Sequence, residues 1–197
     1  RRLCYNLDVG SRRFGRRGSR TVDLISIEYV LKEVEAAGFK APTPIQSQGW
    51  PMALSGLDVV GIAQTGSGKT VAIGFAVASH LRDDDPFVDE NQAQARDRRP
   101  WPRVLLIAPT RELAGQLGKE LEWLYRPLGA RIVVVTGGTN LGLDFRAFQR
   151  RPEVLVGTPG RLYDHVQRGS FDLGDVRAVV LDEAEEMLDM GFKDELE

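Results

Sequence analysis

The chain of 197 residues is long enough for one large domain, and 42% hydrophobic with 27% charged residues is ordinary for a globular protein. Its apolar runs, such as 104–108 and 132–135, are much shorter than the roughly 20 residues of a membrane-spanning helix, so we expect no contact with a membrane. The single Cys4 excludes a disulfide or a cysteine metal cluster within the chain and fits a reducing compartment.

Residues 1–20 differ from the rest because they hold seven Arg and one Asp, a net charge of +6 in a chain whose total is −2. Their Gly, Ser and Arg content, without apolar periodicity, predicts a basic flexible tail able to neutralise phosphates. A passive linker fits the same composition. An Arg-rich start with few acids is also typical of organellar transit peptides, so we expect an intracellular protein and leave nucleus, cytoplasm and mitochondrion open.

Beyond the tail, short apolar runs alternate with helical stretches. A first amphipathic helix is predicted over 23–35, closing at Gly38, with a loop at 38–44, and further helices are predicted to begin near Gly68, Arg111, Gly160 and Glu183. Strands are predicted at 58–62, 104–108, 132–135, 154–156 and 178–181, and a surface loop at 83–102. Because these strands are apolar on successive residues, we expect an α/β fold with a mostly parallel sheet between helices.

The segment AQTGSGKT at 63–70 follows the run DVVGI and precedes an apolar helical stretch, the order of a phosphate-binding loop. Glycines let backbone amides approach phosphate oxygens, and the helix N-terminus adds partial positive charge. We expect Lys69 to reach the outer phosphates of a nucleotide and Thr70 to offer its hydroxyl to Mg²⁺, although Ala63 stands where the general pattern has Gly. The predicted nucleotide-binding residues here are Ala63, Gln64, Thr65, Gly66, Ser67, Gly68, Lys69 and Thr70.

A second acidic element, LDEAEE at 181–186, follows the last predicted strand. Asp182 is predicted to hold Mg²⁺ together with Thr70, and Glu183 to orient or deprotonate the attacking water. Carboxylates also favour helix N-termini, so this element alone would more simply describe an acidic helix start. The phosphate-binding loop upstream favours the catalytic interpretation, with Lys69, Asp182 and Glu183 as catalytic residues.

Together these segments resemble the motifs of the DEAD-box ATP-dependent RNA helicases, in the same order and from about Asp23 to the C-terminus. GFKAPTPIQ at 38–46 is similar to the Q motif, and LDEAE at 181–185 to a DEAD motif with Glu185 in last place. PTRELA at 109–114, TGG at 136–138 and TPGRL at 158–162 are similar to the RNA-contacting motifs. The resemblance implies a first RecA-like domain over 21–197 that uses ATP and Mg²⁺, with Gln46 reading the adenine edge.

The RNA-contacting motifs also make physical sense, because they follow predicted strands at their junctions with helices. Ligands of such sheets bind beyond the carboxyl ends of the strands, where side chains and helix-start amides approach a sugar-phosphate backbone without reading its sequence. The predicted RNA-binding residues are Pro109, Thr110, Arg111, Gly137, Gly138, Thr158, Pro159, Gly160 and Arg161.

The resemblance further implies that the protein continues past Glu197, through an SAT motif, into a second RecA-like domain with arginine fingers. Such an arginine stabilises the charge that develops during hydrolysis, so the 197 residues alone are not expected to unwind RNA. The complete protein is expected to remodel RNA duplexes or RNA–protein complexes, with ribonucleoprotein partners possible.

Two departures from the family pattern leave a rival interpretation open. Thr21 stands where the family has an aromatic residue that stacks on adenine, and Glu185 is one methylene longer than the usual Asp. Both departures fit a non-catalytic RNA clamp or ribonucleoprotein assembly scaffold, whereas intact Lys69, Asp182 and Glu183 argue for an enzyme. A DNA translocase or an unrelated P-loop ATPase would not explain PTRELA together with TPGRL.

Overall fold

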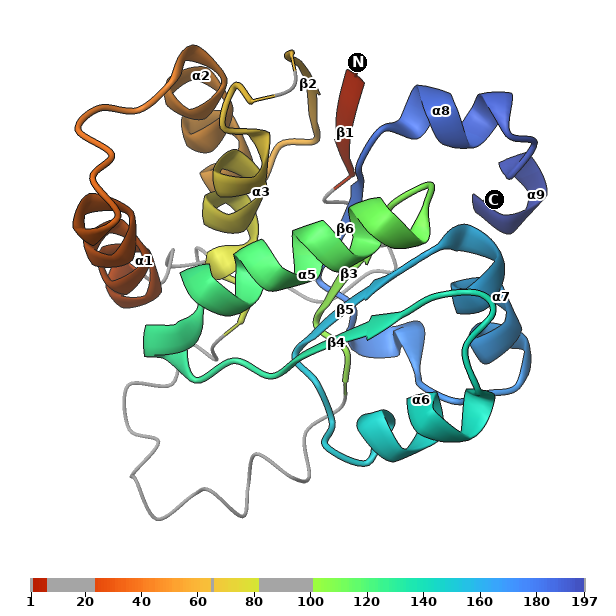
Figure 1. Ribbon diagram of the computed structural model, residues 1–197. Coiled ribbons are helices and arrows are strands. Elements are labelled where there is room, and N and C mark those ends of the chain that lie inside the picture. The colour runs from red at the N-terminus through yellow and green to blue at the C-terminus, as the bar shows by residue number, and fades with distance from the viewer. Residues whose placement is uncertain (1, 7–23, 65, 82–100, 197) are drawn as a thin grey trace, which may run out of the picture.

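The computed structural model describes residues 2–6, 24–64, 66–81 and 101–196, which surround a six-stranded sheet in the order β2-β1-β6-β3-β5-β4 (Figure 1). Its strands are β1 (Arg2–Asn6), β2 (Val59–Ile62), β3 (Val104–Ile107), β4 (Ile132–Val135), β5 (Val154–Gly157) and β6 (Ala178–Leu181). The pairs β3–β5, β3–β6 and β4–β5 are parallel, while β1 is antiparallel to both of its neighbours. The predicted mostly parallel α/β sheet is confirmed, with each predicted strand within one residue of its position.

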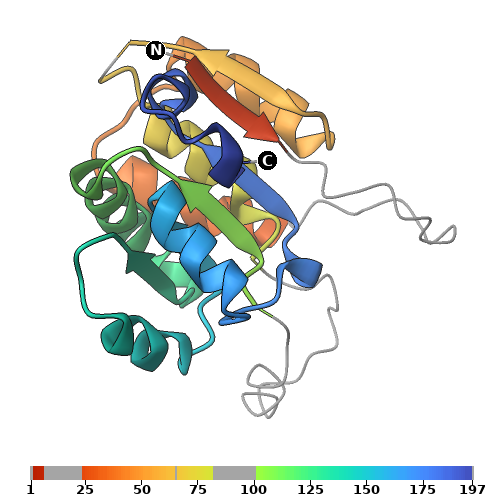
Figure 2. The ribbon, with the colours of Figure 1, turned by 90° about the vertical axis from the view of Figure 1, so that its right-hand side faces the viewer.

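The prediction of a flexible tail is wrong for the first described segment. Arg2–Asn6 form β1, which pairs with β2 through Leu3 opposite Gly61 and with β6 through Cys4 opposite Leu181 (Figure 2). The reason is that a strand between two others is held by backbone hydrogen bonds, which an Arg-rich composition does not reveal. Residues 7–20 lie outside the described part of the chain.

The helices are α1 (Leu24–Ala36), α2 (Pro44–Leu54), α3 (Lys69–Ala78), α5 (Arg111–Leu124), α6 (Leu141–Phe148), α7 (Pro159–Gln167), α8 (Ala184–Asp189) and α9 (Lys193–Leu196), with 3-10 turns η2 (Arg126–Leu128) and η3 (Leu173–Asp175). The five predicted helices correspond to α1, α3, α5, α7 and α8, whereas α2, α6 and α9 were not predicted. Within the described ranges no helix is long and apolar enough to cross a bilayer.

Apolar side chains leave the sheet on both faces, as the unbroken apolar runs predict. In β3, Val104 and Leu106 join one buried cluster with apolar residues of α1, α2, α3 and α5. Leu105 and Ile107 join a second cluster on the other face with Phe148 of α6, Leu162 of α7 and Met187 of α8. The sheet is thus the middle of three layers (Figure 2).

Helix α2 was not predicted because two prolines interrupt its apolar pattern, Pro44 at its first turn and Pro51 inside it. Contacts with α3 hold it in place: the Trp50 ring stacks on Phe75 at 4.2 Å between centroids, and Trp50 Nε1 donates to the carbonyl of Ala72 at 3.2 Å. Helix α2 therefore lies against the helix that begins in the phosphate-binding loop.

All the parallel strands end at one edge of the sheet. Because β1 is antiparallel to both β2 and β6, these two run in the same direction, and β2 ends at that edge too. Two halves of this edge follow from the strand order: β2 and β6 lie on one side of β3, and β5 and β4 on the other.

Candidate functional site

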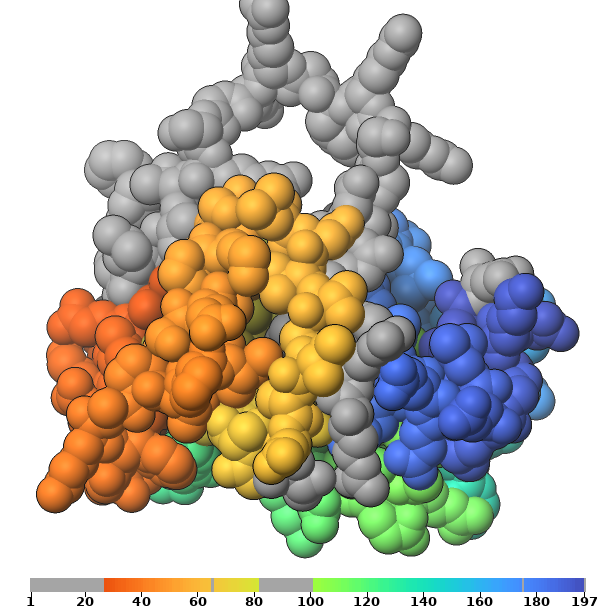
Figure 3. Space-filling view, turned by 90° about the horizontal axis from the view of Figure 1, so that it is seen from above, coloured from red at the N-terminus to blue at the C-terminus, as the bar shows by residue number. Residues whose placement is uncertain are grey.

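The phosphate-binding loop connects β2 to α3 and lies between α2 and the C-terminal helices when viewed from above (Figure 3). Gly66 and Gly68 have φ of +79° and +85°, a conformation that favours glycine. A Cβ on Gly68 would lie 2.5 Å from Nε2 of Gln46, so this position also lacks room for a side chain. The loop has the backbone shape that the sequence predicts, and Thr65 lies outside the described residues.

Gln46 is 3% exposed and joins the start of α2 to this loop. Its Oε1 accepts from the backbone N–H of Thr43 at 2.9 Å, and its Nε2 donates to the carbonyl of Gly68 at 3.1 Å. The carboxamide therefore fixes the entrance of the loop, while the adenine contact stays a prediction.

Lys69 meets the predicted catalytic carboxylate. Lys69 Nζ lies 3.1 Å from Oε1 of Glu183, and the two side chains are 11% and 7% exposed. Glu183 has φ of +57°, rare for a residue with a long side chain, and such a conformation costs about 1–3 kcal/mol. Strained backbone of this kind is concentrated at functional sites, and here it directs the carboxylate toward the loop.

The neighbouring Asp182 has a largely buried carboxyl group. Burial raises the pKa of its carboxyl above the usual value, and the positive charge of Lys69 only partly opposes this shift. Among the described residues, Asp182 Oδ1 and the buried hydroxyl of Ser67 have no hydrogen-bond partner. A divalent cation suits these buried oxygens, because hard cations prefer oxygen ligands, so Asp182 with the Thr70 hydroxyl fits a Mg²⁺ site.

The other half of the edge collects the remaining predicted motifs. Thr110 caps α5, its Oγ1 accepting from the N–H of Leu113 at 3.2 Å. Arg111 begins α5 and lays its guanidinium against Gly138, where an added Cβ would lie 2.6 Å from Nη1. Gly138 has φ of +77°, so both its conformation and this contact exclude a side chain. PTRELA and TGG thus meet at one surface.

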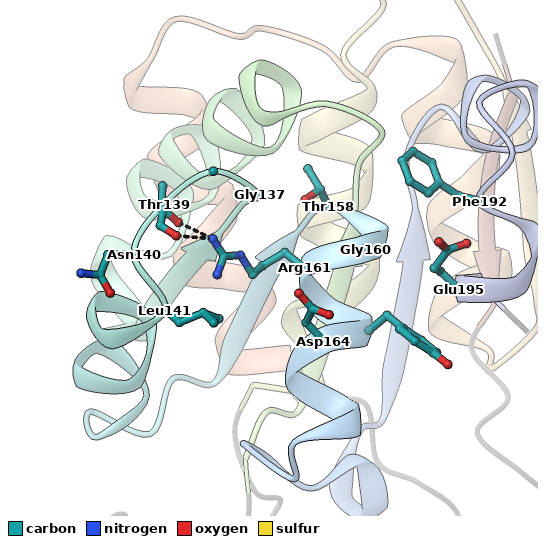
Figure 4. A pocket seen from close by; sticks show the side chains of 12 residues that line it. Gly137, Thr139, Asn140, Leu141, Thr158, Gly160, Arg161, Asp164, Phe192 and Glu195 are labelled. Atoms are coloured by element: carbon teal, nitrogen blue, oxygen red, sulfur yellow. Dashed lines mark hydrogen bonds between the residues drawn. The ribbon is translucent and has the colours of Figure 1, made fainter.

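An open pocket of about 790 Å³ lies between the loop at 136–140, the start of α7 and the C-terminal helix (Figure 4). It is lined by Gly137, Gly138, Thr139, Asn140, Leu141, Thr158, Gly160, Arg161, Tyr163, Asp164, Phe192 and Glu195. Five predicted RNA-binding residues are therefore brought together, whereas Pro109, Thr110, Arg111 and Pro159 are not among the lining residues.

One predicted contact residue has an unexpected orientation. The Arg161 side chain is 5% exposed, and its guanidinium points at the loop of 136–140 (Figure 4). Its partner Asp144 and the neighbouring His165 are also buried, and neither was singled out from the sequence. The available signal was helical spacing, since His165 lies four residues after Arg161 on one face of α7.

The sequence profile of the DEAD/DEAH box helicases matches residues 43–197, which include the phosphate-binding loop and both halves of the edge. The chain belongs to the DEAD/DEAH box helicase family. Its relatives include the ATP-dependent RNA helicase dbp2 of Sclerotinia sclerotiorum, 46% identical over 85% of this chain. The DEAD-box ATP-dependent RNA helicase CshA of Bacillus subtilis is 40% identical over the same share. The chain spans 28% and 31% of the length of these two relatives.

Solved structures of helicases share the RecA-like fold. The yeast DEAD-box splicing factor Prp28 superimposes with a TM-score of 0.74 over 98% of this chain and 43% of its own, at 25% identity. A hypothetical ATP-dependent RNA helicase from Sulfolobus tokodaii gives 0.68 over 86% of this chain and 45% of its own, at 29% identity. The chain corresponds to less than half of each of these helicases.

Proposed function

We propose that the protein containing this chain is an ATP-dependent RNA helicase, and that these residues form its ATP-binding, RNA-contacting domain. The observation that carries the proposal is the pair of Lys69 and Glu183, which brings a phosphate-binding loop and a catalytic carboxylate within 3.1 Å. The RNA-type motifs share the same edge of the sheet, and the relatives named above are ATP-dependent RNA helicases.

Each residue of the nucleotide site has a separate role in phosphoanhydride hydrolysis. The loop amides of 64–70 bind the phosphates and Lys69 neutralises the outermost one, which frees Glu183 to orient the attacking water. Asp182 and Thr70 would hold Mg²⁺, which neutralises charge on the phosphates when bound. A second RecA-like domain in the complete protein would close the site and supply an arginine.

RNA would bind along the other half of the edge, with its phosphates near the loop of 136–140 and the start of α7. Backbone amides and hydroxyls position a strand without reading its sequence, which suits remodelling of varied RNA duplexes or RNA–protein complexes. The scaffold alternative is not favoured, because Lys69, Asp182 and Glu183 converge as an active site requires.

The test is an ATPase titration with RNA on the complete protein. We expect turnover to rise with RNA and to be lost in Glu183→Gln, which keeps the size of the side chain but removes its charge. Absence of turnover above the Glu183→Gln background at saturating RNA would contradict the enzyme and leave the scaffold. We expect the 197-residue chain alone to show neither stimulation nor unwinding.

The variant position Glu185 has a separate expectation. Its side chain is exposed in the first turn of α8, two residues beyond Glu183. We expect Glu185→Asp to alter RNA stimulation of the ATPase more than ATP affinity, because Mg²⁺ and water belong to Asp182 and Glu183. An equal change in both quantities would assign Glu185 to the nucleotide site itself.

A further inference from the structure

The loop of 136–140 owes its shape to a buried arginine beneath it. Arg161 Nε donates to the carbonyl of Thr136 at 3.0 Å, and Nη2 donates to the carbonyl and hydroxyl of Thr139 (Figure 4). These contacts join both ends of the segment that carries the glycine pair. The guanidinium therefore holds the loop in place. Because the side chain is buried, holding the loop is its main role, ahead of any direct contact with an RNA phosphate.

A buried guanidinium needs a counter-charge, and Asp144 of α6 supplies it. Asp144 is 6% exposed, and its Oδ2 lies 3.4 Å from Arg161 Nη1 and 3.0 Å from Nε2 of His165. Removing one member of such a buried pair leaves the other uncompensated, which is costly in a low-dielectric interior. Asp144 is thus the group that keeps Arg161 in place.

His165 in turn fixes Asp144. The ring is fully buried between the aromatic rings of Phe145 and Phe148, and its Nδ1 lies 3.0 Å from Oγ of Ser170. Because a carboxylate only accepts, Nε2 must donate to Asp144. Nδ1 pairs with the Ser170 hydroxyl, so both ring nitrogens have hydrogen-bond partners and the ring is held on both sides.

We propose that Asp144 is a positioning residue for RNA binding, which acts through Arg161 to hold the loop of 136–140 in its binding shape. The inference rests on the proposed function, because it assigns RNA to the pocket beside this loop. Preorganised groups avoid the cost of ordering when a ligand binds, so a loosened loop binds RNA more weakly. His165 and Ser170 support the same geometry from the far side of Asp144.

The sign of the change in RNA affinity distinguishes a positioning role of Asp144 from a general electrostatic effect. Asp144→Asn removes a negative charge near a polyanion site, which by itself strengthens RNA binding. Loss of positioning should instead weaken RNA binding, because a neutral Asn no longer balances the charge of Arg161. Asp164 provides the matched control, since its carboxylate lines the same pocket and its removal changes the charge equally.

The experiment measures the affinity of the complete protein for single-stranded oligouridylate by fluorescence anisotropy, with ATP·Mg²⁺ affinity recorded in parallel. We expect Asp144→Asn to weaken RNA binding about tenfold, the loss that corresponds to one hydrogen bond to a charged group. Asp164→Asn should tighten it by about twofold. ATP affinity should stay unchanged in both, which shows that the fold is intact.

Unchanged or tighter RNA binding by Asp144→Asn overturns the proposal. If that variant fails to fold, His165→Phe replaces it, because an aromatic ring suits Phe145 and Phe148, leaves Asp144 without one donor and preserves its charge. We expect weaker RNA binding again, and unchanged binding overturns the proposal. Absence of RNA binding by the wild type contradicts the proposed function instead.

A double-mutant cycle distinguishes action through Arg161 from general loosening of α6. We expect Arg161→Gln to weaken RNA binding and to abolish the effect of adding Asp144→Asn, because the carboxylate then has no guanidinium to hold. Additive losses in the double variant would mean that Asp144 acts on RNA binding by another route, and they overturn the positioning role.

Discussion

The binding edge has a nucleotide half, formed by the loop of 63–70 with Asp182 and Glu183, and a proposed RNA half, formed by the loop of 136–140 and the start of α7. These two halves differ in how well their polar groups are satisfied. In the nucleotide half, Ser67 and Asp182 have buried oxygens without partners among the described residues, and Glu183 has a strained backbone. In the RNA half, Arg161 and Asp144 are buried as well, yet they form an ion pair with each other, and Arg161 also donates to the carbonyl of Thr136. Both halves lie on the same sheet, so the difference comes from their side chains and loops.

This contrast indicates how each half meets its ligand. Unsatisfied buried oxygens cost free energy in the nucleotide half, and a cation bound with the phosphates would relieve that cost. The RNA half is preorganised, so little ordering remains when a strand binds. We therefore expect mutations in the nucleotide half to abolish ATP binding, and mutations in the RNA half to weaken RNA binding only partly.

The largest expected effect is in the nucleotide half. Lys69→Ala or Asp182→Ala should weaken Mg²⁺-dependent ATP binding more than 100-fold, roughly the loss of a buried charge partner. Lys32→Ala is the control, because its side chain is 64% exposed and pairs with Glu28 on the surface of α1. Calorimetry on folded variants provides the affinities. Normal ATP affinity in both site variants would mean that the phosphates bind elsewhere.

Gly68→Ala tests whether the shape of the loop matters as much as its charge. The new Cβ meets Nε2 of Gln46, and φ of +85° costs an alanine about 1–2 kcal/mol, so ATP affinity should fall at least about tenfold. Gly49→Ala in α2 is the matched control, because nothing lies within 4 Å of its added methyl. Equal ATP affinity of the two variants would show that the loop adapts freely.

Gly138→Ala applies the same substitution to the RNA half. Its Cβ would displace the guanidinium of Arg111, and φ of +77° adds strain, so RNA affinity should fall by several-fold, up to about tenfold. ATP affinity should not change, because the loop belongs to the other half. Gly115→Ala in α5 has open space around its methyl and controls for the substitution. A loss of ATP binding in Gly138→Ala would mean that the halves are not separable.

Local patterns predicted the nucleotide half better than the RNA half. The strand, the glycine-rich loop and the helix follow one another within 59–78, so the place of Lys69 follows from neighbouring residues. The inward direction of Arg161 does not, because it depends on Asp144 and on the carbonyls of a loop 22 and 25 residues away. A charged residue is usually exposed, so the sequence favours a surface contact.

The same argument explains the missed elements of the fold. Helix α2 contains Pro51 and lacks a clear apolar stripe, so its contacts with α3, not its own pattern, define it. Strand β1 is recognisable only through its partners β2 and β6, which lie more than 50 and 170 residues further along the chain. Elements with a strong apolar pattern of their own were predicted, whereas α2 and β1, which lack one, were not.

The smallest expected effect concerns the core that the two halves share. Tyr125 follows α5, whose first residue is Arg111, and its hydroxyl donates to the carbonyl of Gly74 in α3 at 2.6 Å. Burial raises the pKa of the Tyr125 phenol well above 10. The hydroxyl is fully buried, so Tyr125→Phe should lower the free energy of unfolding by about 1 kcal/mol at pH 7, without changing ATP or RNA affinity.

The sign of this effect should reverse at high pH. An unfolded tyrosine loses its proton near pH 10, whereas the folded Tyr125 keeps its proton, so the stability that the buried phenol provides is complete below pH 10 and declines above it. At pH 11 the wild type should lose about 1.4 kcal/mol that Tyr125→Phe does not lose, which makes the variant at least as stable. Urea unfolding of both proteins at pH 7 and 11 measures the difference between their free energies of unfolding and its change of sign. A constant difference between them would mean that the folded phenol ionises as readily as the unfolded one, and that α3 and α5 part easily enough for water to reach it.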